Sequence, residues 1–314
     1  MMRAALIRLS RSKRIAGALS TNRLAWSAAR RFVAGETVEQ AVDVVRDLNG
    51  HGLLATLDRL GENVTAALEA EEAGAAYVDM VERILAAGLD ATVSLKLTSM
   101  GLDIGDELAT EQVRRIADRA AAADPPIEVT IDMESSAYTQ RTLDIFHAVH
   151  RAQPHVAAVV QSYLYRTDDD VERLIEVGAH VRLCKGAYLE PPSVAYPDKK
   201  DADKAFLRQA ARLLSAEARA RGAYLGVATH DTAIIDWTKA FVAENGVSRD
   251  AFEFQMLHGV RRDLQAELAR EGFRMRVYVP FGTHWYPYFT RRLAERPENV
   301  AFMVRNVARE MLRR

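Results

Sequence analysis

Short apolar stretches rich in β-branched residues alternate with longer helical patterns along most of the chain. Eight of these stretches predict strands, at residues 53–61, 91–101, 127–135, 156–164, 181–189, 223–231, 252–257 and 274–282. The segments between them have the periodicity of helices, as at 72–88 and 201–222. A repeated strand–helix order predicts parallel βα units, and eight units favour a closed (β/α)8 barrel of the TIM type.

The alternative for such a pattern is an open, doubly wound sheet. That fold places a glycine-rich phosphate loop after a strand, and the sequence contains neither G-x-G-x-x-G nor G-x-x-x-x-G-K-[ST]. No low-complexity linker divides the chain. The pattern therefore predicts an N-terminal helical arm, residues 1–50, followed by one catalytic barrel, residues 51–314.

The predicted helix at 285–294 has two distinct faces. Tyr288, Arg291, Arg292 and Glu295 fall at i, i+3, i+4 and i+7 and share one face. Trp285, Phe289 and Leu293 form a second, apolar stripe. Such a helix is either an ordinary solvated surface, with Arg291 paired to Glu295, or a buried helix that directs two adjacent guanidinium groups at an anion.

Composition and charge narrow the class of protein. The chain has 314 residues, 49% hydrophobic and 27% charged, with a formal net charge of −1. This balance is typical of a globular protein with a large core, and it argues against nucleic-acid binding. The single cysteine, Cys184, excludes an intrachain disulfide and favours a reducing compartment, so we expect a cytoplasmic protein. No apolar run reaches the roughly 18–20 residues of a membrane span.

The first part of the chain differs in charge from the rest. Eight basic residues lie between Arg3 and Arg31, and the first acidic residue is Glu36. The pattern resembles an organellar transit peptide, but an apolar periodicity through it favours a structured basic helix. Such a helix can rest on anionic lipid or on the protein's own acidic surface. Peripheral contact with the inner face of a membrane is therefore one expectation for this arm.

Polar side chains recur near the C-terminal ends of the predicted strands, where barrel enzymes place their chemistry. They are Ser94, Lys96, Thr98, Asp132, Glu134, Gln161, Arg182, Lys185, Thr229, His230, Gln255 and Tyr278, with Asp58 a less certain member. Each has a structural alternative, such as an ion pair between Lys96 and Asp132 or a core position for His230. Their convergence on one rim favours a binding site, because a barrel folds without polar residues there.

The residue types at this rim indicate what it binds. There is no H-x-H or H-E-x-x-H spacing for a metal and no G-x-S-x-G for a nucleophile. The cations Lys96, Arg182, Lys185, Arg291 and Arg292 instead predict two anionic features, a phosphate-bearing cofactor and a carboxylate substrate. A Schiff-base aldolase or lyase using Lys96 or Lys185 is the alternative enzyme, and a non-catalytic adaptor at a membrane surface is the other.

Eight motifs together resemble those of the proline dehydrogenase family, in its short monofunctional bacterial form. In order they are "VSLKLTSMG", "IDMES", "VVQSYLYR", "VRLCKGAY", "VATHD", "FEFQMLHG", "VYVPFGTH" and "YFTRRLAE". The resemblance implies a distorted barrel that holds FAD, with its last helix over the mouth. It implies oxidation of L-proline to Δ1-pyrroline-5-carboxylate, the first step of proline catabolism, by hydride transfer from C5 to flavin N5. It also implies a quinone as electron acceptor.

The same resemblance assigns roles to individual residues. Asp132 and Arg182 match catalytic positions, with Arg182 also beside the flavin. Lys96, Arg291, Arg292, Tyr278, Tyr288 and Leu257 match substrate-binding positions, and Glu295 matches a residue that positions the arginines. Met133, Gln161, Lys185, Gly186, Ala187, Thr229 and His230 match flavin contacts. The sequence departs from the family pattern at Leu189, where an aromatic often stands, and at Asp231, where some members have Asn.

Overall fold

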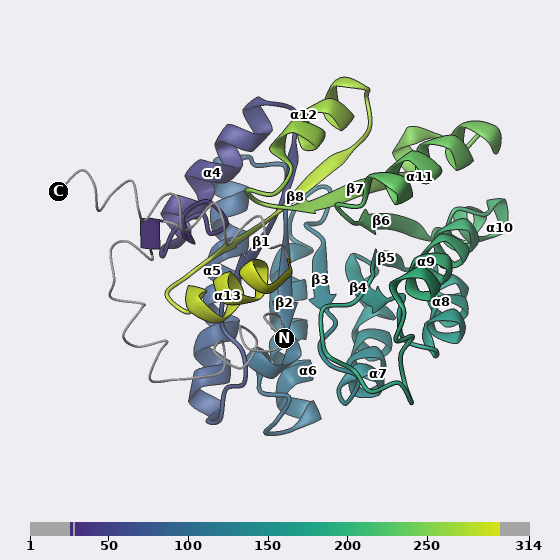
Figure 1. Ribbon diagram of the computed structural model, residues 1–314. Coiled ribbons are helices and arrows are strands. Elements are labelled where there is room, and N and C mark those ends of the chain that lie inside the picture. Colours follow the sequence, from purple (N-terminus) through teal and green to yellow (C-terminus); the bar gives the residue numbers. More distant parts are fainter. Residues whose placement is uncertain (1–25, 28, 296–314) are drawn as a thin grey trace.

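Eight parallel strands close into a barrel in a computed structural model of the chain, which describes residues 26–27 and 29–295 (Figure 1). Each strand pairs with its sequence neighbours, and β8 pairs with β1. The strands are β1 (Leu54–Arg59), β2 (Ala91–Lys96), β3 (Val129–Asp132), β4 (Val156–Gln161), β5 (His180–Cys184), β6 (Tyr224–Ala228), β7 (Phe252–Leu257) and β8 (Met275–Phe281). The predicted barrel class is confirmed.

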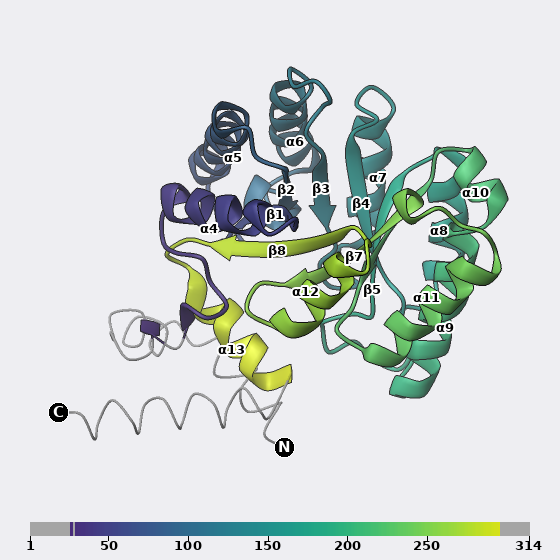
Figure 2. The same ribbon diagram turned by 90° about the horizontal axis from the view of Figure 1, so that it is seen from above.

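Helices surround the barrel and alternate with its strands (Figure 2). They are α4 (Val38–Gly50), α5 (Ala67–Ala87), α6 (Asp106–Ala120), α7 (Thr139–His150), α8 (Thr167–Glu176), α9 (Lys199–Leu213), α10 (Ala216–Ala220), α11 (Thr232–Glu244), α12 (Arg262–Arg270) and α13 (Trp285–Glu295), with the 3₁₀ turns η1 (Leu97–Met100) and η2 (Arg249–Ala251). The outward strand residues Val93 and Leu95 are fully buried in the core that these helices cover.

Two local details differ from the predicted pattern. The β2 strand ends at Lys96 and the chain turns into η1, so Thr98 is not a strand residue. The predicted helix 201–222 is two helices, because Ser215 caps a new one by accepting a hydrogen bond from the Ala218 backbone N–H at 3.2 Å.

Helix α4 takes an unusual place in this barrel. It begins at a capping box, in which the Thr37 hydroxyl accepts from the Gln40 N–H and the Gln40 side chain accepts from the Thr37 N–H. It packs against both β1 and β8. In a regular βα barrel the helix after β8 covers that outer face. Since α4 already covers it, α13 is free to lie elsewhere.

Helix α13 lies across the end of the barrel where the strands finish. It crosses in front of β1 and β2 in Figure 1 and lies to one side of the barrel in Figure 2. Its buried Trp285 and Phe289 pack in one cluster with Leu60, just after β1, and with Leu257 at the end of β7. The predicted helix over the mouth is thus confirmed.

The visible part of the arm packs against α13. Trp26 and Trp285 have ring centroids 5.3 Å apart, and the Arg31 Nε donates to the Gly259 carbonyl at 3.2 Å. Residues 1–25 of the predicted arm lie outside the described residues, as do 296–314 at the other end. The arm's proposed role on a membrane therefore stays a prediction.

Candidate active site

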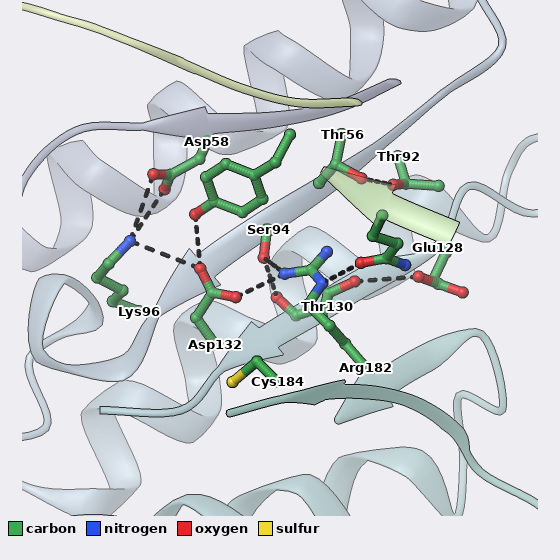
Figure 3. A network of polar contacts seen from close by, with 12 residues as sticks. Thr56, Asp58, Thr92, Ser94, Lys96, Glu128, Thr130, Asp132, Arg182 and Cys184 are labelled. Atoms are coloured by element: carbon green, nitrogen blue, oxygen red, sulfur yellow. Dashed lines mark hydrogen bonds and ion pairs between the residues drawn. The ribbon is translucent and has the colours of Figure 1, made fainter. Parts of the chain in front are cut away.

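A buried cluster of four charged side chains occupies the barrel below α13 (Figure 3). Lys96 Nζ lies 3.2 Å and 3.3 Å from the two carboxylate oxygens of Asp58, and 3.6 Å from Asp132 Oδ2. Arg182 Nη1 donates to Asp132 Oδ1 at 2.7 Å. Two cations and two carboxylates therefore alternate across the interior, as Asp58, Lys96, Asp132 and Arg182.

Strand register explains why these residues meet. Lys96 and Asp132 are direct partners across the β2–β3 pair, and Asp58 is the partner of Ser94 across β1–β2. Side chains alternate between the two faces of a strand, so Ser94 and Lys96 both point into the barrel. The ion pair that the sequence offered as a structural alternative exists, and it belongs to the candidate site.

Arg182 is the most connected member of the cluster. Its Nη1 also donates to the Ser94 hydroxyl at 2.9 Å, and its Nε donates to Gln255 Oε1 at 2.6 Å. Its guanidinium stands 5.3 Å from the centre of the Tyr278 ring. The side chain is only 7% exposed. Nε and Nη1 are thus committed to barrel side chains, while Nη2 has no acceptor among the described residues.

Mutual pairing sets the protonation states of Lys96 and Asp132. Burial alone would lower the pKa of Lys96, but Asp58 and Asp132 outweigh it and raise that pKa well above its ordinary value. Burial would raise the pKa of Asp132, but Lys96 and Arg182 bring it below its ordinary value. Asp58 is 1% exposed, and burial raises its pKa even beside Lys96. Lys96 is therefore an ammonium and Asp132 a carboxylate.

Tyrosine side chains line the cluster on the β8 side. The Tyr278 hydroxyl donates to Asp132 Oδ2 at 2.7 Å, which places its ring beside both Asp132 and Arg182. On α13, Tyr288 is buried and its ring lies 5.2 Å from the Arg292 guanidinium carbon. Leu257, at the end of β7, is partly buried against the apolar cluster that Tyr288 forms with Trp285 and Phe289. Tyr278, Tyr288 and Leu257 therefore lie at the same end of the barrel.

The two other α13 residues proposed for the site are only partly observed. Arg291 and Glu295 lie on α13, but their side chains fall outside the described part of the structure. The described Arg292 is partly buried rather than solvated. The prediction that α13 directs its cations inward thus rests on Arg292, and the roles of Arg291 and Glu295 stay predictions.

A second group of the predicted residues lies at the ends of β4, β5 and β6. Gln161 Nε2 donates to the Glu134 carbonyl at 2.9 Å, and its Oε1 accepts from the Ala187 N–H at 3.3 Å. Gln161 therefore holds the loop after β5 against the end of β3. Met133 is buried beside this junction in the main core.

Thr229 and His230 follow β6 in the same group. The Thr229 hydroxyl accepts from the Asp231 N–H at 3.1 Å, and His230 Nε2 accepts from the Leu257 N–H at 3.0 Å. An imidazole nitrogen that accepts a hydrogen bond carries no proton, so a neutral His230 is protonated on Nδ1. Both residues directly follow the C-terminal end of β6, at the barrel mouth.

Lys185 is engaged more fully than the sequence predicted. Its Nζ lies 2.6 Å from Asp231 Oδ2 and 2.6 Å from Asp203 Oδ1 on α9. Lys199 pairs with the same two carboxylates. Burial would raise the pKa of Asp231, but hydrogen bonds from Lys185 and Lys199 lower it to about 2. Lys185 thus reaches a ligand only with its remaining N–H or by exchanging a carboxylate partner.

Gly186, between Lys185 and Ala187, has a backbone that only glycine adopts without strain. Its φ is +125°, and a Cβ there would lie 2.3 Å from the Tyr163 ring. We expect Gly186→Ala to lower the free energy of unfolding by about 1–3 kcal/mol, the typical cost of one strained backbone position. Urea denaturation tests this. Gly61→Ala is the matched control, because a Cβ added at that position would have no atom within 4 Å. Equal losses of unfolding free energy in the two variants would contradict the assignment.

Sequence patterns left one member of the cluster, Asp58, uncertain and did not indicate Tyr77, which packs beside it. Asp58 stands in a stretch with little other polar character, so its membership was uncertain. Tyr77 comes from α5, where helical periodicity assigns it to the core. Its hydroxyl donates to the Ser94 carbonyl at 2.8 Å and accepts from the Arg59 N–H at 3.2 Å. It braces the strands that carry Asp58 and Ser94.

Within residues 26–27 and 29–295, no three His, Cys, Asp or Glu side chains are grouped as metal ligands would be. In the same part of the chain, no helix combines the length and the apolar character that crossing a bilayer demands.

Comparison with known proteins identifies the family. The family profile described as proline dehydrogenase matches residues 41–305. The chain is 44% identical to proline dehydrogenase 1 of Bacillus subtilis subsp. natto over 283 residues, covering 90% of this chain and 91% of the relative. The chain belongs to the proline dehydrogenase family. Proline dehydrogenase of Deinococcus radiodurans is 43% identical over 287 residues, with 90% of each chain covered.

Solved structures agree with the fold of this family. The crystal structure of proline utilization A (PutA) from Bdellovibrio bacteriovorus superimposes with a TM-score of 0.80 at 22% identity. The match covers 93% of this chain but 36% of that larger chain. At this identity the likeness establishes the barrel fold alone, and the assignment to the proline dehydrogenase family rests on the sequence matches.

Proposed function

We propose that this barrel binds FAD at the ends of β4–β6 and uses it to oxidise L-proline to Δ1-pyrroline-5-carboxylate. Membership of the proline dehydrogenase family supports an oxidoreductase acting on proline. The observation that carries the proposal further is the state of Arg182. Its Nε and Nη1 are held by the barrel interior, and Nη2 has no acceptor in the described part of the chain.

The residues at the ends of β4–β6 fit a flavin. Arg182 and Lys185 supply positive charge, and Thr229 and His230 supply polar side chains. The loop through Gly186 packs too closely on the Tyr163 ring for any side chain at that position, so this ring holds the backbone beside Lys185 in place. A bound flavin supplies a two-electron acceptor for hydride. The protein's residues position the substrate and the charges around it.

The opposite side of the mouth fits proline. Lys96 has three N–H donors, of which Asp58 and Asp132 occupy two directions, and the third remains for a carboxylate. Arg292 on α13 supplies a second cation, and we propose that Arg291 beside it supplies a third. Tyr278 and Tyr288 supply aromatic rings at the same end of the barrel, and we propose that these rings pack against the five-membered ring of proline.

Oxidation removes a hydride from C5 of proline and a proton from its nitrogen, and leaves a C=N bond. The nitrogen must lose its ammonium proton first, because a protonated amine has no lone pair to form that bond. None of the described residues of the cluster is a neutral base beside this position. We propose that the amine binds deprotonated or transfers its proton to water, while Arg182 compensates negative charge on the reduced cofactor.

A Schiff-base aldolase or lyase is not favoured for this site. Such chemistry needs a neutral amine as nucleophile. The two flanking carboxylates keep Lys96 protonated, and Lys185 is held by Asp203 and Asp231. The family of the chain also points to oxidation rather than to carbon–carbon cleavage.

We propose a quinone as electron acceptor, reached at a membrane surface. The support is the exposure of two large apolar side chains, one on the connection after β4 and one on the connection after β5. Leu189 is 62% exposed, Tyr165 is 43% exposed, and the Tyr165 N–H donates to the Val194 carbonyl at 3.0 Å. Peripheral contact through these side chains and the basic arm would bring the barrel mouth to the lipid that dissolves the quinone.

An absorption spectrum tests the proposed function. The purified protein is expected to show the visible bands of an oxidised flavin, and anaerobic L-proline is expected to bleach them within the mixing time or seconds. D-Proline at the same concentration serves as the stereochemical control and should bleach them far more slowly. A colourless protein that does not bind added FAD, or a yellow protein that proline does not reduce, would contradict the proposal.

A further inference from the structure

A second buried ion pair lies deeper in the barrel, on the side of the cluster away from α13. Arg276 Nε donates to Glu253 Oε1 at 2.5 Å, and its Nη2 donates to Glu253 Oε2 at 3.0 Å. Glu253 is 2% exposed and Arg276 is 8% exposed. Arg276 Nη1 also donates to the Ala55 carbonyl at 2.8 Å. This bidentate pair is therefore fixed to the wall of the barrel.

Gln255 connects this pair to Arg182. Its Nε2 donates to Glu253 Oε1 at 2.7 Å, and its Oε1 accepts from Arg182 Nε at 2.6 Å. A carboxylate paired with an arginine accepts hydrogen bonds and cannot donate them. Glu253 therefore requires the NH₂ end of the Gln255 amide, and the oxygen end must face Arg182. The ion pair of Glu253 with Arg276, deeper in the barrel, therefore determines the orientation of the Gln255 amide.

Gly226 on β6 leaves room for this amide. A Cβ at Gly226 would lie 2.5 Å from Gln255 Nε2. The Gly226 backbone is not in the left-handed region, so alanine is compatible with the strand itself. The Gln255 amide therefore fits beside β6 only because Gly226 carries no methyl group.

We propose that Gln255, oriented by Glu253, is a positioning residue that holds the Arg182 guanidinium in register with the cofactor while adding no negative charge to it. This inference rests on the proposed function. Three barrel groups fix the guanidinium plane: the amide oxygen of Gln255 on Nε, and Asp132 and Ser94 on Nη1. These contacts leave Nη2 as the edge of the guanidinium with no acceptor in the described part of the chain.

The neutrality of the amide matters because Arg182 has one carboxylate partner, Asp132, which it shares with Lys96. A second carboxylate, bound to Nε, would further neutralise the positive charge of the Arg182 guanidinium. The guanidinium would then attract negative charge on the reduced cofactor less strongly. An amide oxygen binds Nε with good geometry and leaves that charge in place. The site thereby keeps a positive charge in a buried position.

Three variants separate the roles of orientation and charge. Gln255→Leu removes the acceptor, Gly226→Ala displaces it without deleting any partner, and Gln255→Glu allows charge to be added. The introduced carboxyl would stand among Arg182, Glu253, Arg276 and Glu128, and its nearness to Glu253 favours its protonated form. In that form it donates to Glu253 and accepts from Arg182, as the amide does. Gln209→Leu, a buried glutamine between α9 and α8, is the matched control.

The first measurement is the kinetics and the flavin midpoint potential of the loaded enzyme. We expect Gln255→Leu to lower kcat about tenfold or more, as loss of one preorganised contact does, with KM for proline within about twofold. Gly226→Ala should change kcat in the same direction. The ratio of the Gln255→Glu kcat to the wild-type kcat should fall as pH rises, with a midpoint potential that becomes more negative. Wild-type kcat and potential in all three variants would overturn the proposal.

The second measurement does not require the cofactor. The Nε–H signal of Arg182 in ¹⁵N-arginine-labelled protein, assigned by its loss in Arg182→Lys, should exchange slowly in wild type and in Gln209→Leu. It should exchange at least about tenfold faster in Gln255→Leu and Gly226→Ala, because the acceptor is gone or displaced. Unchanged exchange would overturn the positioning role even if the protein proved to bind no flavin, so the two failures are distinguishable.

Discussion

Replacing Asp132 with asparagine is expected to lower the rate of flavin reduction by proline at least about 100-fold. Asp132 accepts from Arg182 and Tyr278 and lies 3.6 Å from Lys96. The asparagine amide has one acceptor oxygen, and its NH₂ group must face a donor, so at least one buried contact is lost. Loss of one partner from a buried charged network costs about 3–5 kcal/mol.

Anaerobic stopped-flow mixing with proline measures this rate, and urea denaturation of the same samples reports the stability. Asp43→Asn is a suitable control, because Asp43 forms an exposed ion pair with Arg46 on α4. Exposed pairs contribute less than about 1 kcal/mol. If proline reduces the flavin of the Asp132→Asn variant at a rate within about threefold of the wild-type rate, the cluster has a structural role only.

Arg292→Ala is expected to raise the KM for proline about 10- to 100-fold while flavin stays bound. A hydrogen bond to a charged partner contributes about 1.5–3 kcal/mol, and we propose that Arg292 donates one to the substrate carboxylate. The residues at the ends of β4–β6 that we propose bind the flavin are untouched. Arg292→Lys should recover part of the loss, because it restores the charge without the planar fork.

Steady-state kinetics with flavin content measured on each sample tests this prediction. Arg270→Ala, at the exposed end of α12, controls for the loss of one surface arginine. If Arg292→Ala keeps the wild-type KM, the guanidinium does not bind the carboxylate. If instead flavin is lost together with proline affinity, the assignment of α13 to the substrate side is wrong.

Much of the barrel was predictable from local pattern. All eight strands lie within or beside their predicted stretches, because β-branched runs between amphipathic helices carry that information locally. The contact between Lys96 and Asp132 was also predictable, because parallel register brings equivalent strand ends together. What the pattern overestimated was strand length, as at β2, where the chain turns into η1 directly after Lys96.

Other parts of the site depend on contacts that no local pattern encodes. Tyr77 reaches the strands from α5, and Asp203 reaches Lys185 from α9. Each lies on a helix whose periodicity assigns it to core or to surface. The place of α13 over the mouth came from the family resemblance. Its physical cause is that α4, from before the barrel, already covers β1 and β8.

The most direct test of the account is a crystal structure of the flavin-loaded protein with an unreactive proline analogue whose ring nitrogen is replaced by oxygen. The account predicts that the analogue's carboxylate lies within hydrogen-bonding distance of Lys96 Nζ and the Arg292 guanidinium, with its ring between Tyr278 and Tyr288 and one face toward the flavin. An analogue bound elsewhere, with Lys96 contacting Asp58 and Asp132 alone and Arg292 turned to solvent, would contradict it.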